Sequence, residues 1–170
     1  MHYDIDPQAP PPVRIGCLAL VRNSRGQILV VRPTYGARLY QLPGGHRQAG
    51  ERKTDAAKRE LAEETGLALP RGRQLVVDEI DERPGVHTAS INWVYDFGIC
   101  PDSTVIRLPA PPGTGEPPEL DAYLWLSTDA LDEHCADYMS KRIRRSEQAR
   151  VENTVFELLR GDLVEPEGQH

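Results

Sequence analysis

Three glutamates on one face of a predicted helix constrain this chain more than any other feature. Glu60, Glu63 and Glu64 stand at positions i, i+3 and i+4, so on a helix of 3.6 residues per turn their side chains share a face. Like charges at this spacing oppose helix formation by about 0.2–0.5 kcal/mol per pair, and the residues one turn earlier are small, neutral alanines. Because hard divalent cations take oxygen ligands, the stripe indicates a metal site; an acidic solvent-facing helix is the alternative.

The residues around the glutamates predict a strand, a glycine-rich loop and a helix, in that order. Residues 42–45 (LPGG) end an extended stretch and force a turn that glycines accept easily. Thr54 and Asp55 are good residues for the N-terminus of a helix, and Gly66 stands where a left-handed C-cap belongs. The three carboxylates are therefore expected on the inner face of a helix that ends at Gly66.

The complete spacing of this stretch resembles the signature box of the Nudix hydrolases. Nine specified positions match at their fixed intervals, namely Gly45, Glu51, Arg59, Glu60, Leu61, Glu63, Glu64, Gly66 and Leu67. So many positions at set intervals are far more specific than a short glycine motif. The resemblance implies a Nudix-like α/β/α sandwich with a mixed β-sheet. It also implies hydrolysis of a pyrophosphate bond in a nucleoside diphosphate linked to another group X, giving a nucleotide, nucleotide-sugar or ADP-ribose type of substrate.

The resemblance further implies roles for individual residues of the box. Arg59 would orient the carboxylates, by pairing with Glu51. The expected cofactor is Mg²⁺ or Mn²⁺, with more than one ion at the site, and the implied metal ligands are the backbone carbonyl of Gly44 and the side chains of Glu60, Glu63 and Glu64.

The sequence leaves the general base open between the box and a later loop. By position Glu60 matches the box glutamate often assigned this role, whereas other Nudix members use a glutamate that follows the box. Glu116 and Glu119 are the candidates here, with a solvated loop carboxylate as the alternative for both. Glu119 is favoured as a catalytic residue because it lies closer to the strand expected to begin at Ala122, which should hold it more firmly.

Two tyrosines and one histidine near the box are candidate substrate contacts. Tyr35 and Tyr40 are candidates to border a base or ribose, with ordinary half-buried packing as the alternative. His46 follows the box glycine directly and is the third candidate, with a polar loop position as its alternative. The basic run at residues 141–145 (KRIRR) indicates a solvated helix face, and its alternatives are a phosphate contact or a homodimer interface.

Apolar patterning predicts the remaining elements. Strands are expected at residues 13–21, 27–31, 74–80, 89–99 and 122–126. In the fourth of these, apolar and other residues alternate over 91–97, which predicts one packed face. A short helix capped by residues 127–129 and a helix over 137–160, broken near Ser146, complete the pattern. The proline- and glycine-rich residues 101–118 form a long loop, for which a compact domain usually has a use.

The length and these elements indicate one Nudix domain over residues 13–160. Residues 1–12 end in a proline run and are expected to be an N-terminal tail, and residues 161–170 are expected to be a frayed C-terminal tail. No internal repeat or second domain emerges from the 170 residues.

Composition favours a cytoplasmic protein that acts on a small molecule. The net charge of −6 and the pI of about 5.4 argue against stable nucleic-acid binding, which needs a basic surface. A small phosphorylated substrate stays compatible, because a bound metal brings its own positive charge. The three cysteines stand at unrelated spacings, which indicates reduced thiols. Neither a signal peptide nor a membrane-spanning apolar run is apparent, so no membrane association is expected.

A non-catalytic Nudix-fold nucleotide sensor, or regulatory binding module, is the alternative function. A pure binder has no need for all three glutamates together with Arg59. The complete box therefore favours a metal-dependent pyrophosphohydrolase.

Overall fold

The computed structural model describes residues 12–165 and residue 168. The expected N-terminal tail at residues 1–12 therefore lies, apart from Pro12, outside the described residues. Within the described part of the chain, no helix is long and apolar enough to cross a membrane. The three cysteines are all buried and free, as their spacing predicts.

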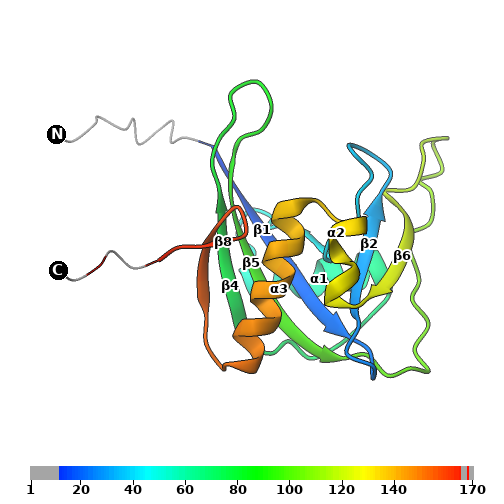
Figure 1. The fold of residues 1–170 in the computed structure, drawn as a ribbon. Helices are drawn as coiled ribbons and strands as arrows, with labels where there is room; N and C mark the ends of the chain where they lie inside the picture. Colours follow the sequence, from blue (N-terminus) through cyan, green and yellow to red (C-terminus); the bar gives the residue numbers. More distant parts are fainter. Residues whose placement is uncertain (1–11, 166–167, 169–170) are drawn as a thin grey trace.

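A mixed sheet forms the middle layer of the molecule (Figure 1). Within the described residues its eight strands are β1 (Val13–Arg22), β2 (Ile28–Pro33), β3 (Gly44–His46), β4 (Gln74–Ile80), β5 (Ala89–Ile99), β6 (Leu120–Leu126), β7 (Phe156–Leu159) and β8 (Asp162–Leu163). They are ordered β6-β2-β1-β5-β4-β7-β8, with β3 paired to β1 off this path. The β1–β5 and β4–β7 pairs are parallel and the other pairs are antiparallel. The sequence prediction of a mixed sheet is thus confirmed.

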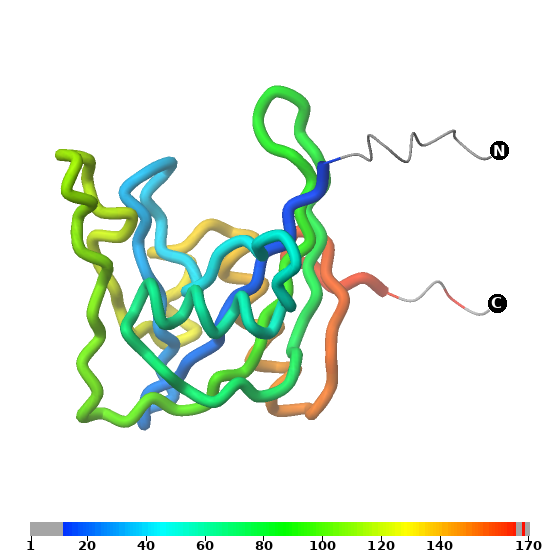
Figure 2. The backbone as a smooth tube through the Cα atoms, turned by 180° about the vertical axis from the view of Figure 1, so that it is seen from behind, coloured from blue at the N-terminus to red at the C-terminus, as the bar shows by residue number. Residues whose placement is uncertain are grey.

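Helices cover both faces of this sheet. Helix α1 (Lys53–Thr65) lies behind the sheet in Figure 1 and in front of it in Figure 2. On the opposite face lie α3 (Asp137–Val151) and the short α2 (Leu131–His134), which follows a 3₁₀ turn at Thr128–Ala130. One hydrophobic core lies under each layer, so the predicted α/β/α sandwich is confirmed.

Strand β1 contributes to both cores, because successive side chains of a strand point to opposite faces. Leu18 and Leu20 pack with α3, whereas Cys17 and Ala19 pack with α1. The same holds for β5. Its alternating aromatic residues belong to the core of α1, but Val94 is buried in the other core, so the prediction of a single packed face is wrong. A strand in the middle of three layers buries both of its faces.

The C-terminal region differs from the helix predicted over residues 137–160. Helix α3 continues through Ser146, whose hydroxyl donates to the Arg142 carbonyl at 2.8 Å, and it ends at Val151. Asn153 then adopts a left-handed conformation (φ 53°), which helices do not continue through. The apolar residues that follow form β7, and β8 pairs with β7, so the chain is not frayed from Asp162. Apolar residues at 155–159 suit an amphipathic helix and a short strand alike, and pairing with β4 selects the strand.

The ends of α1 agree only in part with the caps predicted from the sequence. Gly66 is left-handed (φ 72°) and its N–H donates to the Ala62 carbonyl, as predicted. At the other end the N-cap is Arg52, with no side-chain cap, so Thr54 and Asp55 lie inside the first turn. Ser127 likewise precedes its 3₁₀ turn without a side-chain cap.

Candidate active site

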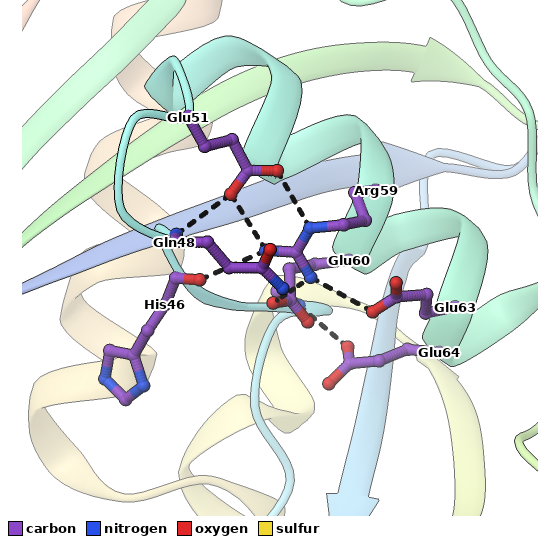
Figure 3. A network of polar contacts seen from close by, with 8 residues as sticks. His46, Gln48, Glu51, Arg59, Glu60, Glu63 and Glu64 are labelled. Carbon is purple, nitrogen blue, oxygen red and sulfur yellow. Dashed lines mark hydrogen bonds and ion pairs between the residues drawn. The ribbon is translucent and has the colours of Figure 1, made fainter.

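The guanidinium of Arg59 is the hub of the polar network between α1 and the loop before it (Figure 3). Its Nε and Nη2 donate to the two oxygens of Glu51 at 2.8 and 3.0 Å, which is the pairing that the sequence predicted. Its Nη1 donates to Glu60 at 2.7 Å and to Glu63 at 3.0 Å, and Nη2 also reaches the His46 carbonyl at 3.2 Å. One side chain of α1 thus ties the loop to the glutamate face.

This network perturbs the ionisation of Glu51. The Arg59 guanidinium, and then the backbone N–H of Gln48, lower the pKa of the Glu51 carboxyl to about 2. Glu51 is therefore ionised at neutral pH and compensates the charge of Arg59. This arrangement fits an orienting role better than proton transfer.

Glu64 is the buried member of the glutamate stripe. The backbone N–H of Gly44 donates to its Oε2 at 2.8 Å. Burial raises the pKa of Glu64 to about 8 against the lowering effect of that hydrogen bond, and the nearby charges of Glu60, Glu119 and Glu63 raise it further. Glu64 therefore sits among carboxylates whose charge the surrounding protein compensates only in part.

Glu60 lies against the glycine-rich loop. Burial raises the pKa of its carboxyl, and Arg59 opposes this. A Cβ atom on Gly45 would lie 2.5 Å from the carboxyl carbon of Glu60 and 2.6 Å from both of its oxygens. Gly44 has a φ of +146°, and a Cβ there would lie 2.4 Å from the Cys17 carbonyl. The two glycines are thus required so that the loop can approach both β1 and the Glu60 carboxylate.

A cleft of about 410 Å³ opens beside these residues. Glu60, Glu119, Tyr35, His46 and the two loop glycines line it together. In Figure 3 the His46 ring points away from the Arg59 network. The backbone carbonyl of Glu119 accepts a hydrogen bond from the Thr34 N–H at 3.0 Å, which attaches the residue before β6 to the end of β2.

Two other residues do not lie where the sequence suggested. Tyr40 does not line the cleft: its ring meets that of His134 edge-on, with centroids 6.0 Å apart, and it packs on the core under α3. A substrate contact by Tyr40 therefore stays a prediction, and the packing that the structure shows corresponds to the half-buried alternative. Glu116 lies outside the cleft and lines a neighbouring hollow that also includes Tyr35 and Glu119.

The basic run at residues 141–145 is not simply a solvated face. Arg142 is buried, and its Nε donates to Asp78 at 2.6 Å; the two side chains are 3% and 0% exposed. Sequence reasoning missed both residues, although a signal was present. Asp78 interrupts an apolar strand, and Arg142 lies one helical turn after Met139, on the apolar stripe of α3. A charged residue on each of two apolar faces indicates a buried pair. Arg142 also lines the cleft, together with Asn92.

The predicted metal ligands form no ready-made cage. Among the described residues, no group of three or more His, Cys, Asp or Glu side chains is arranged to hold a metal ion. Arg59 engages one oxygen each of Glu60 and Glu63, and the Glu63 side chain is 60% exposed. Glu60 and Glu64 remain as the neighbouring carboxylates whose charges oppose each other.

The comparison with known proteins identifies the family. The family model described as NUDIX domain matches residues 11–146, so the chain belongs to the Nudix family. It is a Nudix hydrolase, which favours the enzyme over the sensor.

Solved structures share the fold over most of the chain. MutT protein from Methanosarcina mazei Go1 is 23% identical, with 85% of this chain and 98% of that chain covered and a TM-score of 0.66. A MutT NUDIX hydrolase from Burkholderia pseudomallei is 26% identical, with coverages of 81% and 98% and a TM-score of 0.64. An ADP-ribose pyrophosphatase from Streptococcus suis is 16% identical, with coverages of 86% and 98% and a TM-score of 0.60.

One curated relative has a different name. An octanoyltransferase of Myxococcus xanthus is 44% identical over 66 residues, which are 36% of this chain and 18% of that protein. The chain thus spans less than a fifth of the length of this relative. A match of this extent carries no transferase activity to the chain.

Proposed function

We propose that this Nudix hydrolase cleaves the pyrophosphate bond of a nucleoside diphosphate linked to a second group X, with Mg²⁺ or Mn²⁺ as cofactor. The observation that carries the proposal is the pair Glu60 and Glu64, two carboxylates with raised pKa values beside a cleft of about 410 Å³. A diphosphate is anionic, so a cleft walled by carboxylates binds it only through cations that neutralise both sides.

The donor chemistry of this pair fits a hard divalent cation. Both side chains offer carboxylate oxygens, and their mutual repulsion is relieved by a cation between them. Magnesium is usually bound by one or two carboxylates together with substrate phosphates, rather than by a complete protein cage. A site formed by Glu60, Glu64 and the diphosphate is therefore consistent with the lack of a three-residue group in the described part of the chain. Glu63 and the Gly44 carbonyl would add oxygen ligands at its edge.

Each residue of the network then has a task. When bound, the metal supplies positive charge on the phosphate oxygens and lowers the pKa of an attacking water. Arg59 holds Glu60 in place, and Glu51 holds Arg59. Glu119 takes the proton from the water: it lines the cleft, and no hydrogen bond or ion pair to its carboxylate occurs among the described residues. Tyr35, whose side chain is 59% exposed at the cleft, offers a surface for the base or ribose.

ADP-ribose is the first substrate to test, because the relative from Streptococcus suis is described as an ADP-ribose pyrophosphatase. With saturating Mg²⁺ we expect AMP and a ribose phosphate as products. With a chelator we expect no turnover and an unchanged circular dichroism spectrum. Turnover that persists at full rate in chelator would remove the metal from the proposal.

The matched pair Glu119→Gln and Glu116→Gln tests the role of the loop. Glutamine keeps the volume of the side chain and removes its charge. For Glu119→Gln we expect kcat to fall by about 10²- to 10⁴-fold, as for loss of a general base. For Glu116→Gln, outside the cleft, we expect kcat within a few-fold of wild type. Should both variants stay near wild type while Glu60→Gln collapses, the base lies in the box.

A further inference from the structure

A second hollow of about 280 Å³ continues the catalytic cleft. The two share His46, Ile80, Ser90 and Tyr138 in their walls. None of the residues near the proposed reaction, from the loop glycines to Glu60, Glu119 and Tyr35, lines the second hollow. It is therefore an extension of the cleft beyond the carboxylates.

Half of the residues that line this extension are arginine or histidine. Arg14, His46, His87 and Arg160 contribute to its wall, whereas no aspartate or glutamate does. We call these four residues the basic annex. Within residues 12–165 and 168, neither of its arginines forms an ion pair, although the chain as a whole carries a net charge of −6. Two arginines without an ion-pair partner in the described part of an acidic chain are suited to an anionic ligand.

The annex is assembled from four separate segments of the chain. Arg14 lies near the start of β1, next to Ser90 in the parallel register with β5. His87 stands in the connection between β4 and β5, where its backbone pairs with that of Arg83 in an isolated antiparallel β-bridge. Arg160 lies in the turn between β7 and β8, and its N–H donates to the Glu79 carbonyl. The start of β1 and the β4–β5 hairpin lie side by side in both views (Figures 1 and 2). Arg14 thus stands on a strand, and backbone pairing with neighbouring residues holds the turn positions of His87 and Arg160.

A second, independent observation lies in the adjoining part of the cleft. Arg142 lines it with a side chain that is 3% exposed, and its Nη2 is buried without a hydrogen-bond partner among the described residues. The ring of Tyr138, which both hollows share, lies 5.4 Å from the Arg142 guanidinium carbon. Buried donors without an acceptor are rare and unfavourable. An oxygen-rich ligand at this end of the cleft would supply the missing acceptor.

We propose that the basic annex binds a phosphate monoester that the substrate carries in addition to its diphosphate. The inference rests on the proposed function and narrows its substrate class. A phosphate monoester carries a charge of about −1.5 to −2 at neutral pH and three acceptor oxygens, which suits several cationic donors. The diphosphate itself belongs at the carboxylate end of the cleft, where the metal would bind. The extra phosphate can stand on X or on the nucleoside, and the test separates the two.

The test compares three ligands that differ only in this phosphate: ADP-ribose, ADP-ribose 1″-phosphate (phosphate on X) and 2′-phospho-ADP-ribose (phosphate on the nucleoside). KM and kcat are measured with Mg²⁺, and the dissociation constant is measured by calorimetry with Ca²⁺ in place of Mg²⁺, since Ca²⁺ also takes oxygen ligands and the diphosphate needs a cation to bind. The variant is the double substitution Arg14→Gln/Arg160→Gln. Both residues are exposed and lie outside the proposed catalytic network. The control is Arg25→Gln, an exposed arginine in the turn beyond the opposite end of β1.

For wild type and the control, we expect one phosphorylated ligand to bind at least about tenfold more tightly than ADP-ribose, as for one added charged hydrogen bond. In the double variant this advantage should disappear, while KM and kcat for ADP-ribose stay within about twofold of wild type. Equal affinity of wild type for all three ligands, or no detectable binding, overturns the annex. So does an advantage that survives the double substitution.

The two proposals fail in different ways. Hydrolysis of all three ligands without a phosphate advantage removes the annex and keeps the pyrophosphatase. A phosphate advantage in calorimetry that the double variant loses, without hydrolysis of any ligand, keeps the annex and removes the proposed function for these substrates.

Discussion

Replacement of Arg142 by methionine should destabilise the fold more than most single substitutions. The Arg142 Nε lies 2.6 Å from Asp78, and the two side chains are 3% and 0% exposed. Without the arginine, Asp78 stays buried with the N–H of Gly161, at 3.1 Å, as its remaining side-chain hydrogen bond within the described residues. Removal of one partner of a buried ion pair costs about 3–5 kcal/mol. For a domain of this size each kcal/mol lowers the melting temperature by about 2–4 °C, so we expect a fall of about 6–20 °C.

A double variant distinguishes the effect of breaking the ion pair from the effect of removing side-chain volume. Asp78→Leu/Arg142→Met removes both charges, so it should recover most of the stability that Arg142→Met loses. A residual loss of about 1–3 kcal/mol is expected because the Gly161 N–H is left without an acceptor. Arg145→Met is the matched control, since Arg145 lies on the same helix and its side chain bonds to Gln148. We expect that control within about 0.5 kcal/mol of wild type.

Urea unfolding followed by circular dichroism measures these differences, with thermal melting as a second readout. Two results would refute the reasoning. One is a loss of less than about 1 kcal/mol in the free energy of unfolding for Arg142→Met, since a buried carboxylate without its partner should cost more than that. The other is a double variant whose loss of stability equals the sum of the losses of Arg142→Met and Asp78→Leu, each measured alone, because a real pair must show coupling.

Two further predictions concern the box. Because Arg59 lowers the pKa of Glu51 from 4.5 to about 2, the pair contributes stability above about pH 4.5 that is lost as the pH falls towards 2. The melting temperatures of wild type and Glu51→Gln should therefore differ by a constant amount near neutral pH and converge in acid; an offset that persists to about pH 2 would contradict this. Gly45→Ala should lower kcat by about 10²-fold, because its Cβ displaces the Glu60 carboxylate, whereas Gly113→Ala, with open space around it, should leave kcat unchanged. Equal kcat values for the two alanine variants would show that the position of Glu60 does not matter.

The sequence alone determined the local part of the site. The spacing of Arg59, Glu60, Glu63 and Glu64 along one helix requires no knowledge of the rest of the chain, because the geometry of a helix fixes which side chains share a face. The pairing of Arg59 with Glu51 followed from the same box. Most strands could also be predicted, since the apolar patterns of β1, β4 and β5 extend over seven or more residues.

The secondary structure of the short apolar segment after α3 could not be predicted from the sequence. Residues 155–159 suit a helix or a strand, and only the free edge of β4 made them a strand. The position of Tyr40 was equally ambiguous, because the amphipathic ring of a tyrosine can line a cleft or pack at the edge of a core. Its contact with His134 comes from a segment that lies far away along the chain.

The tertiary structure alone decided which charges are buried and which gather around the cleft. Arg142 resembles its basic neighbours in sequence, but the approach of α3 to β4 places it on Asp78. The four residues of the basic annex come from β1, β3, the β4–β5 hairpin and the β7–β8 turn. No spacing along the chain encodes their proximity, because strand order and register bring them together. Local periodicity fixes a helix face, whereas a site built from several strands exists only once the sheet has formed.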